Sequence, residues 1–93
     1  MICSFARVET ERFFATGKSH KFPPAILKRA AMRLTQLHAA ATIDDLRNPP
    51  SNHLEALKGD RKGQRSIRIN ERWRICFRFE GKNAFDVEIV DYH

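Results

Sequence analysis

The spacing of apolar residues changes partway along this chain, and that change restricts the possible folds most. In the first half, one set of apolar residues recurs at the spacing of a helix face: Leu27, Ala30, Ala31, Leu34, Leu37 and Ala41. From residue 66 onward the spacing becomes two, which is typical of strands with one buried face. Helices followed by closely spaced strands predict an α+β fold.

Local signals set the boundaries of these elements. A short helix is expected over residues 9–15, with Gly17 as its stop, and a longer one begins at Pro23-Pro24, since proline is tolerated in a first turn. One more turn is expected over 42–46, capped by Thr42. The expected strands span residues 66–70, 73–79 and 85–91, with a weaker candidate at 2–6.

These elements predict a single domain over residues 1–93. Its N-terminal helices would pack on one face of a mostly antiparallel sheet of four to five strands. Three cations of the long helix fall off the apolar stripe and are expected on a solvated face: Lys28, Arg29 and Arg33.

Alternation within the strands predicts two unlike faces of the sheet. One face would carry the apolar residues that meet the helices: Ile67, Ile69, Trp73, Ile75, Phe77, Phe79, Phe85, Val87 and Ile89. Arg68, Arg74 and Arg78 then point the other way, because the opposite register would bury three guanidinium groups. The same parity places three further residues on this face: Asp86, Glu88 and Tyr92. The two acids there would offset part of the positive charge as cross-strand pairs.

The positive charge of the chain is local. Nine Lys and Arg residues and three acids lie between residues 58 and 82, and this difference of six equals the net charge of the whole chain, +6. A basic surface attracts polyanions without sequence preference, so nucleic acid or an acidic partner is expected before a small apolar ligand. The candidate RNA-binding residues are Lys58, Arg61, Lys62, Arg65 and Arg78.

Other classes of protein fit the sequence poorly. No apolar run approaches the ~18–20 residues of a membrane-spanning helix, and residues 1–7 lack the features of a signal peptide, so a cytoplasmic protein is expected. Cys3 and Cys76 show no disulfide framework. Cys76 lies among arginines that could lower its pKa, although an inert thiol is the commoner case. The histidines are scattered and neither cysteine has a partner at ligand spacing, so no metal or cofactor is expected.

Four segments resemble the HigB-type toxins of bacterial toxin–antitoxin modules, part of the wider RelE-like ribonuclease group. They are residues 54–60 (LEALKGD), 66–70 (SIRIN), 73–79 (WRICFRF) and 87–93 (VEIVDYH). The opening residues 1–5 and the stop at 16–18 also look like this family, so the resemblance spans most of the chain. These segments, in this order, are a more specific signal than a lone short motif.

The resemblance implies a compact RelE-like fold, ribosome-dependent cleavage of mRNA, and neutralisation by a small HigA-type helix-turn-helix antitoxin. The catalytic candidates that it implies by position are Arg68, Arg74, Asp91, Tyr92 and His93, with Lys58 beside them. Some relatives have a histidine where this chain has Glu55. Either Glu55 accepts a proton in its place, or His53 reaches the site, or that role is absent here.

RNA can be cut without a metal ion because its 2′-OH is a nucleophile next to the phosphate. The arginines would stabilise the charge on the phosphate, and His93, with an ordinary pKa near 6.5, is the natural proton-transfer group. One alternative of another class stays open. The chain could be a non-catalytic basic module that binds nucleic acid or an acidic protein.

Overall fold

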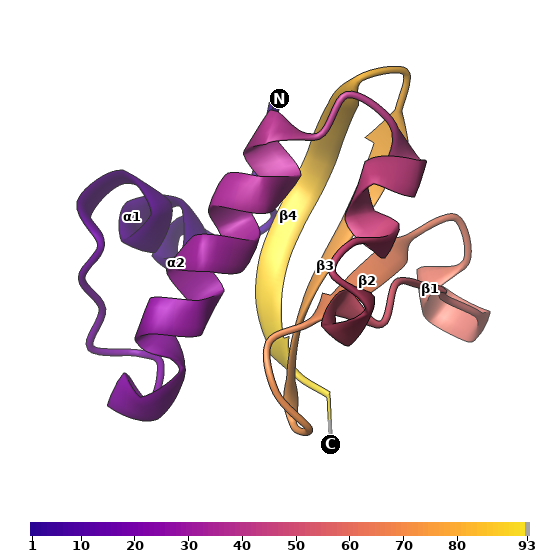
Figure 1. Cartoon of the computed structure of the whole chain (residues 1–93). Helices are drawn as coiled ribbons and strands as arrows, with labels where there is room; N and C mark the ends of the chain where they lie inside the picture. The colour runs from indigo at the N-terminus through magenta and orange to yellow at the C-terminus, as the bar shows by residue number, and fades with distance from the viewer. Residues whose placement is uncertain (93) are drawn as a thin grey trace.

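The computed structural model describes residues 1–92, so the predicted catalytic residue His93 lies outside the described residues. Two helices, α1 (Val8–Thr16) and α2 (Pro24–Ala39), precede four strands: β1 (Glu55–Ala56), β2 (Arg65–Arg68), β3 (Trp73–Glu80) and β4 (Asn83–Asp91). The strands form one sheet in the order β1-β2-β3-β4, and each neighbouring pair is antiparallel. Both helices pack on the same side of this sheet (Figure 1), which confirms the predicted α+β fold.

Helix boundaries lie close to the positions that the sequence predicts. Gly17, with φ of 74°, ends α1, and its N–H donates to the Phe13 carbonyl at 2.7 Å. Pro24 occupies the first turn of α2. Thr42 and Asp45 form a capping box that begins a 3-10 helix, η1 (Ile43–Arg47), and the backbone hydrogen bonds lower the pKa of Asp45. No helix within residues 1–92 is long and apolar enough to cross a membrane.

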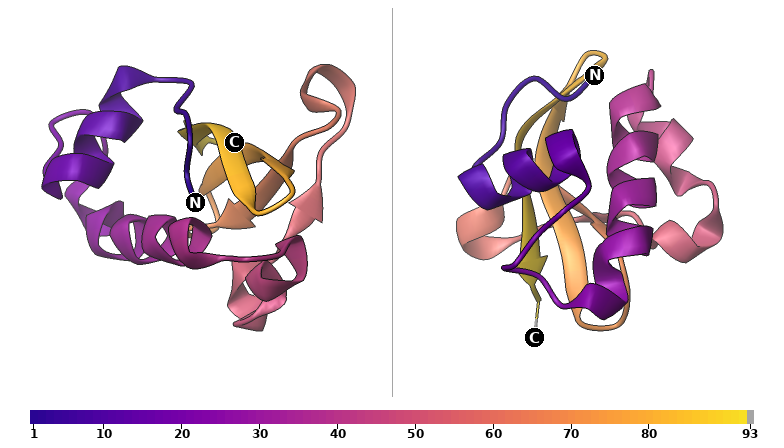
Figure 2. Two further views of the ribbon diagram at one scale, coloured as in Figure 1. Left: turned by 90° about the horizontal axis from the view of Figure 1, so that it is seen from above. Right: turned by 90° about the vertical axis from the view of Figure 1, so that its left-hand side faces the viewer.

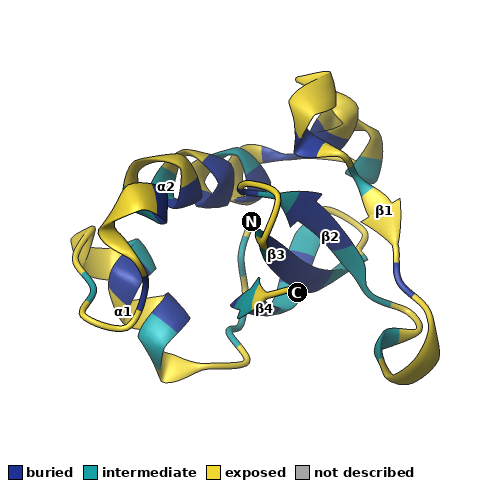
Figure 3. Cartoon of the chain, turned by 90° about the horizontal axis from the view of Figure 1, so that it is seen from below, coloured by how far each residue is buried: buried dark blue, intermediate teal, exposed yellow. Residues whose placement is uncertain are grey.

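The core lies between the helices and one face of the sheet (Figure 3). Its fully buried large side chains come from both layers: Phe13, Leu34, Leu37, Leu46, Ile67, Ile69, Ile75, Phe77 and Val87. Trp73 and Phe79 pack against this core with part of their surface exposed. Ala40 is buried in place of Ala41, because α2 ends at Ala39 and the helical spacing stops there. The predicted inner face of the sheet is therefore confirmed except at Phe85.

Phe85 was predicted on the inner face, and that prediction is wrong. The residue lies on the outer face, where the guanidinium carbon of Arg78 stands 5.3 Å from the centre of its ring. A bulge interrupts the β3–β4 register between Cys76 and Arg78, and Asp86 there has a left-handed φ of 55°. Because a bulge adds a residue to one strand, the alternation reverses beyond it, and Ala84 takes the buried position.

The prediction of a solvated Arg33 is also wrong, whereas Lys28 and Arg29 are exposed as expected. Arg33 is 3% exposed, its Nε donates to the Arg68 carbonyl at 3.1 Å, and its Nη2 donates to the Ser51 hydroxyl at 3.2 Å. Burial, reinforced by the charge of Arg29, lowers the pKa of Arg33. The side chain is tolerated inside because hydrogen bonds to polar groups of β2 and of the 3-10 helix η2 (Pro50–Asn52) replace those to water.

The N-terminal segment covers part of the free edge of β4 (Figure 2). Isolated parallel bridges join Ile2 to Ala84 and Phe5 to Val87, so the weak strand predicted at residues 2–6 forms bridges rather than a continuous strand. Farther along the edge, the buried Thr10 hydroxyl accepts a hydrogen bond from the Ile89 N–H at 3.2 Å. This covering reduces the unpaired backbone that a neighbouring chain could join.

Candidate active site

The outer face of the sheet, opposite the helices, brings several candidate residues together. Arg68 on β2 lies directly across from Arg74 on β3. Tyr92 follows β4, and its N–H donates to the Arg72 carbonyl at 2.7 Å, which extends the pairing beyond the strand. The ring centre of Tyr92 is 5.5 Å from the guanidinium carbon of Arg74. Antiparallel pairing therefore gathers residues of three sequence segments at one end of this face.

Arg74 is enclosed at the centre of this group, with a side chain 8% exposed. Its Nη1 donates to the Ser66 hydroxyl at 2.7 Å and to the His53 carbonyl at 3.3 Å, and its Nη2 donates to the Glu55 carboxylate at 3.0 Å. This enclosure follows from the pairing of β1 with β2, which sets Glu55 opposite Ser66. Arg74 thus lies on the outer face of the sheet, as predicted, but its guanidinium is fixed by neighbouring residues rather than open to solvent.

Arg68 differs from Arg74 in its partners. Its guanidinium makes no ion pair with any residue from 1 to 92, and its Nε is shielded from solvent yet donates to no acceptor in that range. The backbone at this position is fixed, because the Arg68 carbonyl accepts from Arg33. A guanidinium with an unused donor on a fixed backbone is suited to bidentate contact with a phosphate.

Glu55 and His53 lie on the rim of the site. Glu55 bonds to Arg74 through Oε1, and its side chain is 53% exposed. His53 follows η2 (Pro50–Asn52) and has φ of 44°, an uncommon conformation for a residue with a side chain, which directs its carbonyl to Arg74. In the described part of the chain, the Glu55 carboxylate, not the His53 imidazole, is bonded to a site arginine.

The basic turn, residues 58–63, stands beside this group and contains the 3-10 helix η3 (Gly59–Arg61). Lys58 and Lys62 are exposed. Arg61 is paired, since its Nη1 donates to the Glu88 carboxylate at 2.8 Å, and this hydrogen bond raises the pKa of Arg61. Arg65 is placed apart from these cations, because it pairs across from Phe77 and so lies on the inner face of the sheet.

Ion pairs engage two more arginines near the sheet. Arg78 donates to the carboxylates of Asp86, at 2.9 Å, and Glu80. Arg72 donates through Nε to both carboxylate oxygens of Asp91 at 2.9 Å. These hydrogen bonds raise the pKa of both arginines. The predicted cross-strand partner Asp86 is confirmed, and Arg78 is less available to a phosphate than the sequence suggested.

One contributor to this face was not identified from the sequence, and the partners of another differ from those predicted. Ser66 is fully buried and accepts from Arg74, and its position two residues before Arg68 was the available signal, since such residues share a face. Glu88 was expected to pair across the sheet. Its partners are instead Arg61 and Arg7, which no strand spacing indicates, because both lie outside the strands.

The outer face also contains the thiol of Cys76, which is fully buried. Burial raises the pKa of this thiol to about 11, so the nearby arginines do not activate it and the expectation of an inert thiol is supported. Among residues 1–92, no three His, Cys, Asp or Glu side chains lie together as a possible metal site.

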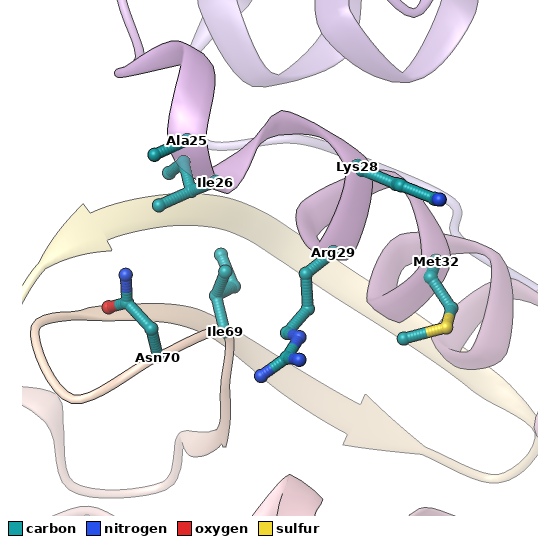
Figure 4. Close-up of a pocket in the computed structure, with 7 residues that line it drawn as sticks. All are labelled: Ala25, Ile26, Lys28, Arg29, Met32, Ile69 and Asn70. Carbon is teal, nitrogen blue, oxygen red and sulfur yellow. The ribbon is translucent and has the colours of Figure 1, made fainter.

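A separate groove of about 480 Å³ lies on the helix side, between the start of α2 and the end of β2 (Figure 4). It is lined by Ala25, Ile26, Lys28, Arg29, Met32, Ile69 and Asn70. None of the predicted site residues is among them. The candidate chemistry therefore belongs to the outer face of the sheet and not to this groove.

Known proteins are similar to this chain over most or all of its length. Residues 3–93 match the family model of the RelE-like toxin of type II toxin–antitoxin system HigB. Toxin HigB-1 of Vibrio cholerae is 40% identical over 70 residues, 74% of each chain. Endoribonuclease HigB of Proteus vulgaris is 34% identical over 93 residues, the full length of both chains. The chain therefore belongs to the HigB family of RelE-like toxins of type II toxin–antitoxin systems.

Proposed function

We propose that this protein is a ribosome-dependent endoribonuclease that stops translation by cutting mRNA. The observation that carries the proposal is the pair Arg68 and Arg74, in which an unpaired guanidinium stands across from a fixed one at the end of the outer face. The printed name of the full-length Proteus vulgaris relative supports the reaction class.

The two arginines have different roles in binding the phosphate. Arg68 contacts the scissile phosphate through its free donors. Arg74, held by Ser66 and Glu55, supplies a preorganised positive charge that needs no rearrangement when negative charge develops. Removing one such donor costs about 10²–10³ in rate in enzymes that use this kind of stabilisation. Lys58 and Lys62 add charge along the RNA backbone from the basic turn.

Cleavage proceeds by attack of the RNA 2′-oxygen on the adjacent phosphorus. Glu55 accepts the 2′-OH proton, because its carboxylate is exposed and lies at the rim of the site beside Arg74. The new 2′-O–P bond forms as the bond from phosphorus to the 5′-oxygen breaks, and His93 protonates that leaving oxygen. The products are a 2′,3′-cyclic phosphate and a 5′-OH, and atoms and protons balance without a metal ion. Each proton transfer contributes on the order of 10²–10⁴ in rate.

Residues at the C-terminal end of β4 support this arrangement. Asp91, whose carboxylate accepts from Arg72, anchors the end of β4. Tyr92 is 45% exposed beside Arg74, so it can stack on an unpaired base or hydrogen-bond the 2′-oxygen. The family also implies a cognate antitoxin. We take it to be a HigA-type helix-turn-helix protein that silences the toxin in the cytoplasm, where mRNA is translated.

The proposal is tested with purified protein and ribosomes that translate a defined mRNA. Primer extension should detect new ends inside the reading frame, and these should be absent without the protein. A shift in RNA mobility with intact transcripts would instead show a non-catalytic basic module and would refute the enzyme.

A further inference from the structure

The carboxylate of Glu88 joins three segments that are distant in sequence. Its Oε1 accepts from Arg61 Nη1 at 2.8 Å, and its Oε2 accepts from Arg7 Nε at 2.9 Å. Arg7 directly precedes α1, Arg61 belongs to η3, and Glu88 lies on β4. The Glu88 side chain is 10% exposed, so these pairs are screened less by water than the ion pairs at the surface.

The basic turn has little else to hold it to the sheet. It projects as an exposed loop between β1 and β2 (Figure 3). Its backbone hydrogen bonds are local, from the Arg61 N–H to Lys58, from the Lys62 N–H to Gly59 and from the Gln64 N–H to Arg61. The Arg61 Nη1 also donates to the Gln64 side-chain oxygen at 3.0 Å, which is again a local bond. Among the hydrogen bonds within residues 1–92, the one from Arg61 to Glu88 joins a side chain of this turn to the central strands.

We propose that Arg61 and Glu88 are positioning residues, whose ion pair fixes the place at which Lys58 and Lys62 meet the RNA backbone. This inference rests on the proposed function. Both oxygens of the Glu88 carboxylate accept a hydrogen bond, and the Arg61 guanidinium is paired with Glu88 rather than free to bind a phosphate. A loop tethered at one such point loses its preferred position when the tether is removed, while the groups around Arg74 stay in place.

Amide hydrogen exchange measures the tether directly, without any cleavage assay. In Glu88→Gln and Arg61→Gln, the amides of Lys62 and Gln64 should exchange about fivefold faster than in the unaltered protein. The double variant should exchange no faster than Arg61→Gln, because both changes remove the pair between Arg61 and Glu88, and only the Arg61 change also removes the bond to the Gln64 side chain. Arg7→Gln should leave these amides unchanged, because it removes only the other half of the carboxylate's pairing. Unchanged exchange in Arg61→Gln would overturn the proposal.

Kinetics on translating ribosomes then show what the tether does. Arg61→Gln and Glu88→Gln should raise KM about fivefold and change kcat by less than about twofold, because the reacting groups are untouched. Arg47→Gln, which removes an exposed pair with Asp44, is a matched control and should alter neither constant. A loss confined to kcat would contradict a positioning role.

The two proposals fail in different ways. If the unaltered protein does not cut mRNA, the proposed function fails, while the exchange result still decides whether Arg61 tethers the turn. If the unaltered protein cuts and KM is the same in Arg61→Gln, the positioning role fails alone. Thermal melting of each variant excludes global unfolding as the cause, and Arg61→Gln retains the bond between Glu88 and Arg7.

Discussion

Replacing Arg74 and Arg68 separately with alanine should have unequal effects on stability and similar effects on cleavage. Both arginines lie at the same end of the outer face, but Arg74 bonds to Ser66, His53 and Glu55, whereas Arg68 makes no ion pair within residues 1–92. Arg74→Ala should therefore destabilise the fold. Arg68→Ala should leave it nearly unchanged.

The magnitude for Arg74→Ala follows from its contacts. The buried Ser66 hydroxyl would lose its donor, which costs roughly 1–3 kcal/mol, and the contact with the Tyr92 ring contributes about 0.5–1 kcal/mol. The pair with Glu55 adds little, because that carboxylate is 53% exposed. Returning a buried guanidinium to water offsets part of the loss. A net cost of about 2 kcal/mol should lower Tm by roughly 8–16 °C in a domain of this size.

Arg68→Ala removes a side chain whose Nε has no acceptor within residues 1–92, so its cost should stay within about 0.5 kcal/mol. Thermal melting by circular dichroism measures both variants. Cleavage is compared on ribosomes below every melting transition, where each variant should lose at least about 10²-fold in rate. Arg74→Lys is the matched control for charge, because it keeps the cation and loses the planar fork. An unchanged Tm in Arg74→Ala would refute the stabilising network, and normal cleavage by Arg68→Ala would refute the phosphate contact.

Two further predictions use other features. Burial raises the Cys76 pKa from 9.0 to about 11, so between these pH values the unfolded chain ionises its thiol while the folded state keeps it neutral. The free energy of unfolding therefore contains a contribution of roughly 3 kcal/mol that is fully present below pH 9 and is lost as the pH rises through 11. Denaturant unfolding should show this decline in the unaltered protein and not in Cys76→Ala, and parallel pH profiles would contradict it. Free RNA should bind at least about tenfold more weakly when salt rises from 50 to 200 mM, as several phosphates release counterions, and salt-independent binding in a filter assay would exclude the basic turn as an RNA surface.

Most of the architecture could be predicted because its signals are local. The helix spacing from Leu27 to Leu37, the stop at Gly17 and the alternation from Trp73 to Phe79 each act within a few residues. Phe85 was misplaced because a bulge depends on how two strands pair, and the sequence of one strand does not reveal it. Arg33 was misplaced for a similar reason, since its acceptors belong to β2 and η2, which are distant from it in sequence.

The candidate site was predictable in its residues but not in their bonding. Parity placed Arg68 and Arg74 on one face, yet it did not distinguish a fixed guanidinium from an unpaired one. That difference arises from β1 and the segment before it, which close over Arg74 only after long-range packing. The pairing of Arg61 with Glu88 likewise joins residues far apart in sequence.

The central claim, cleavage by attack of the RNA 2′-OH, is tested most directly by removing that hydroxyl. The cut position is first mapped on ribosomes that carry a defined mRNA, and one 2′-deoxy nucleotide is then placed immediately 5′ to the cut phosphate. The account predicts that cutting at that bond disappears, while ribosome binding is unchanged and the all-ribose mRNA yields a 2′,3′-cyclic phosphate end. Cleavage of the 2′-deoxy substrate at the normal rate would contradict it.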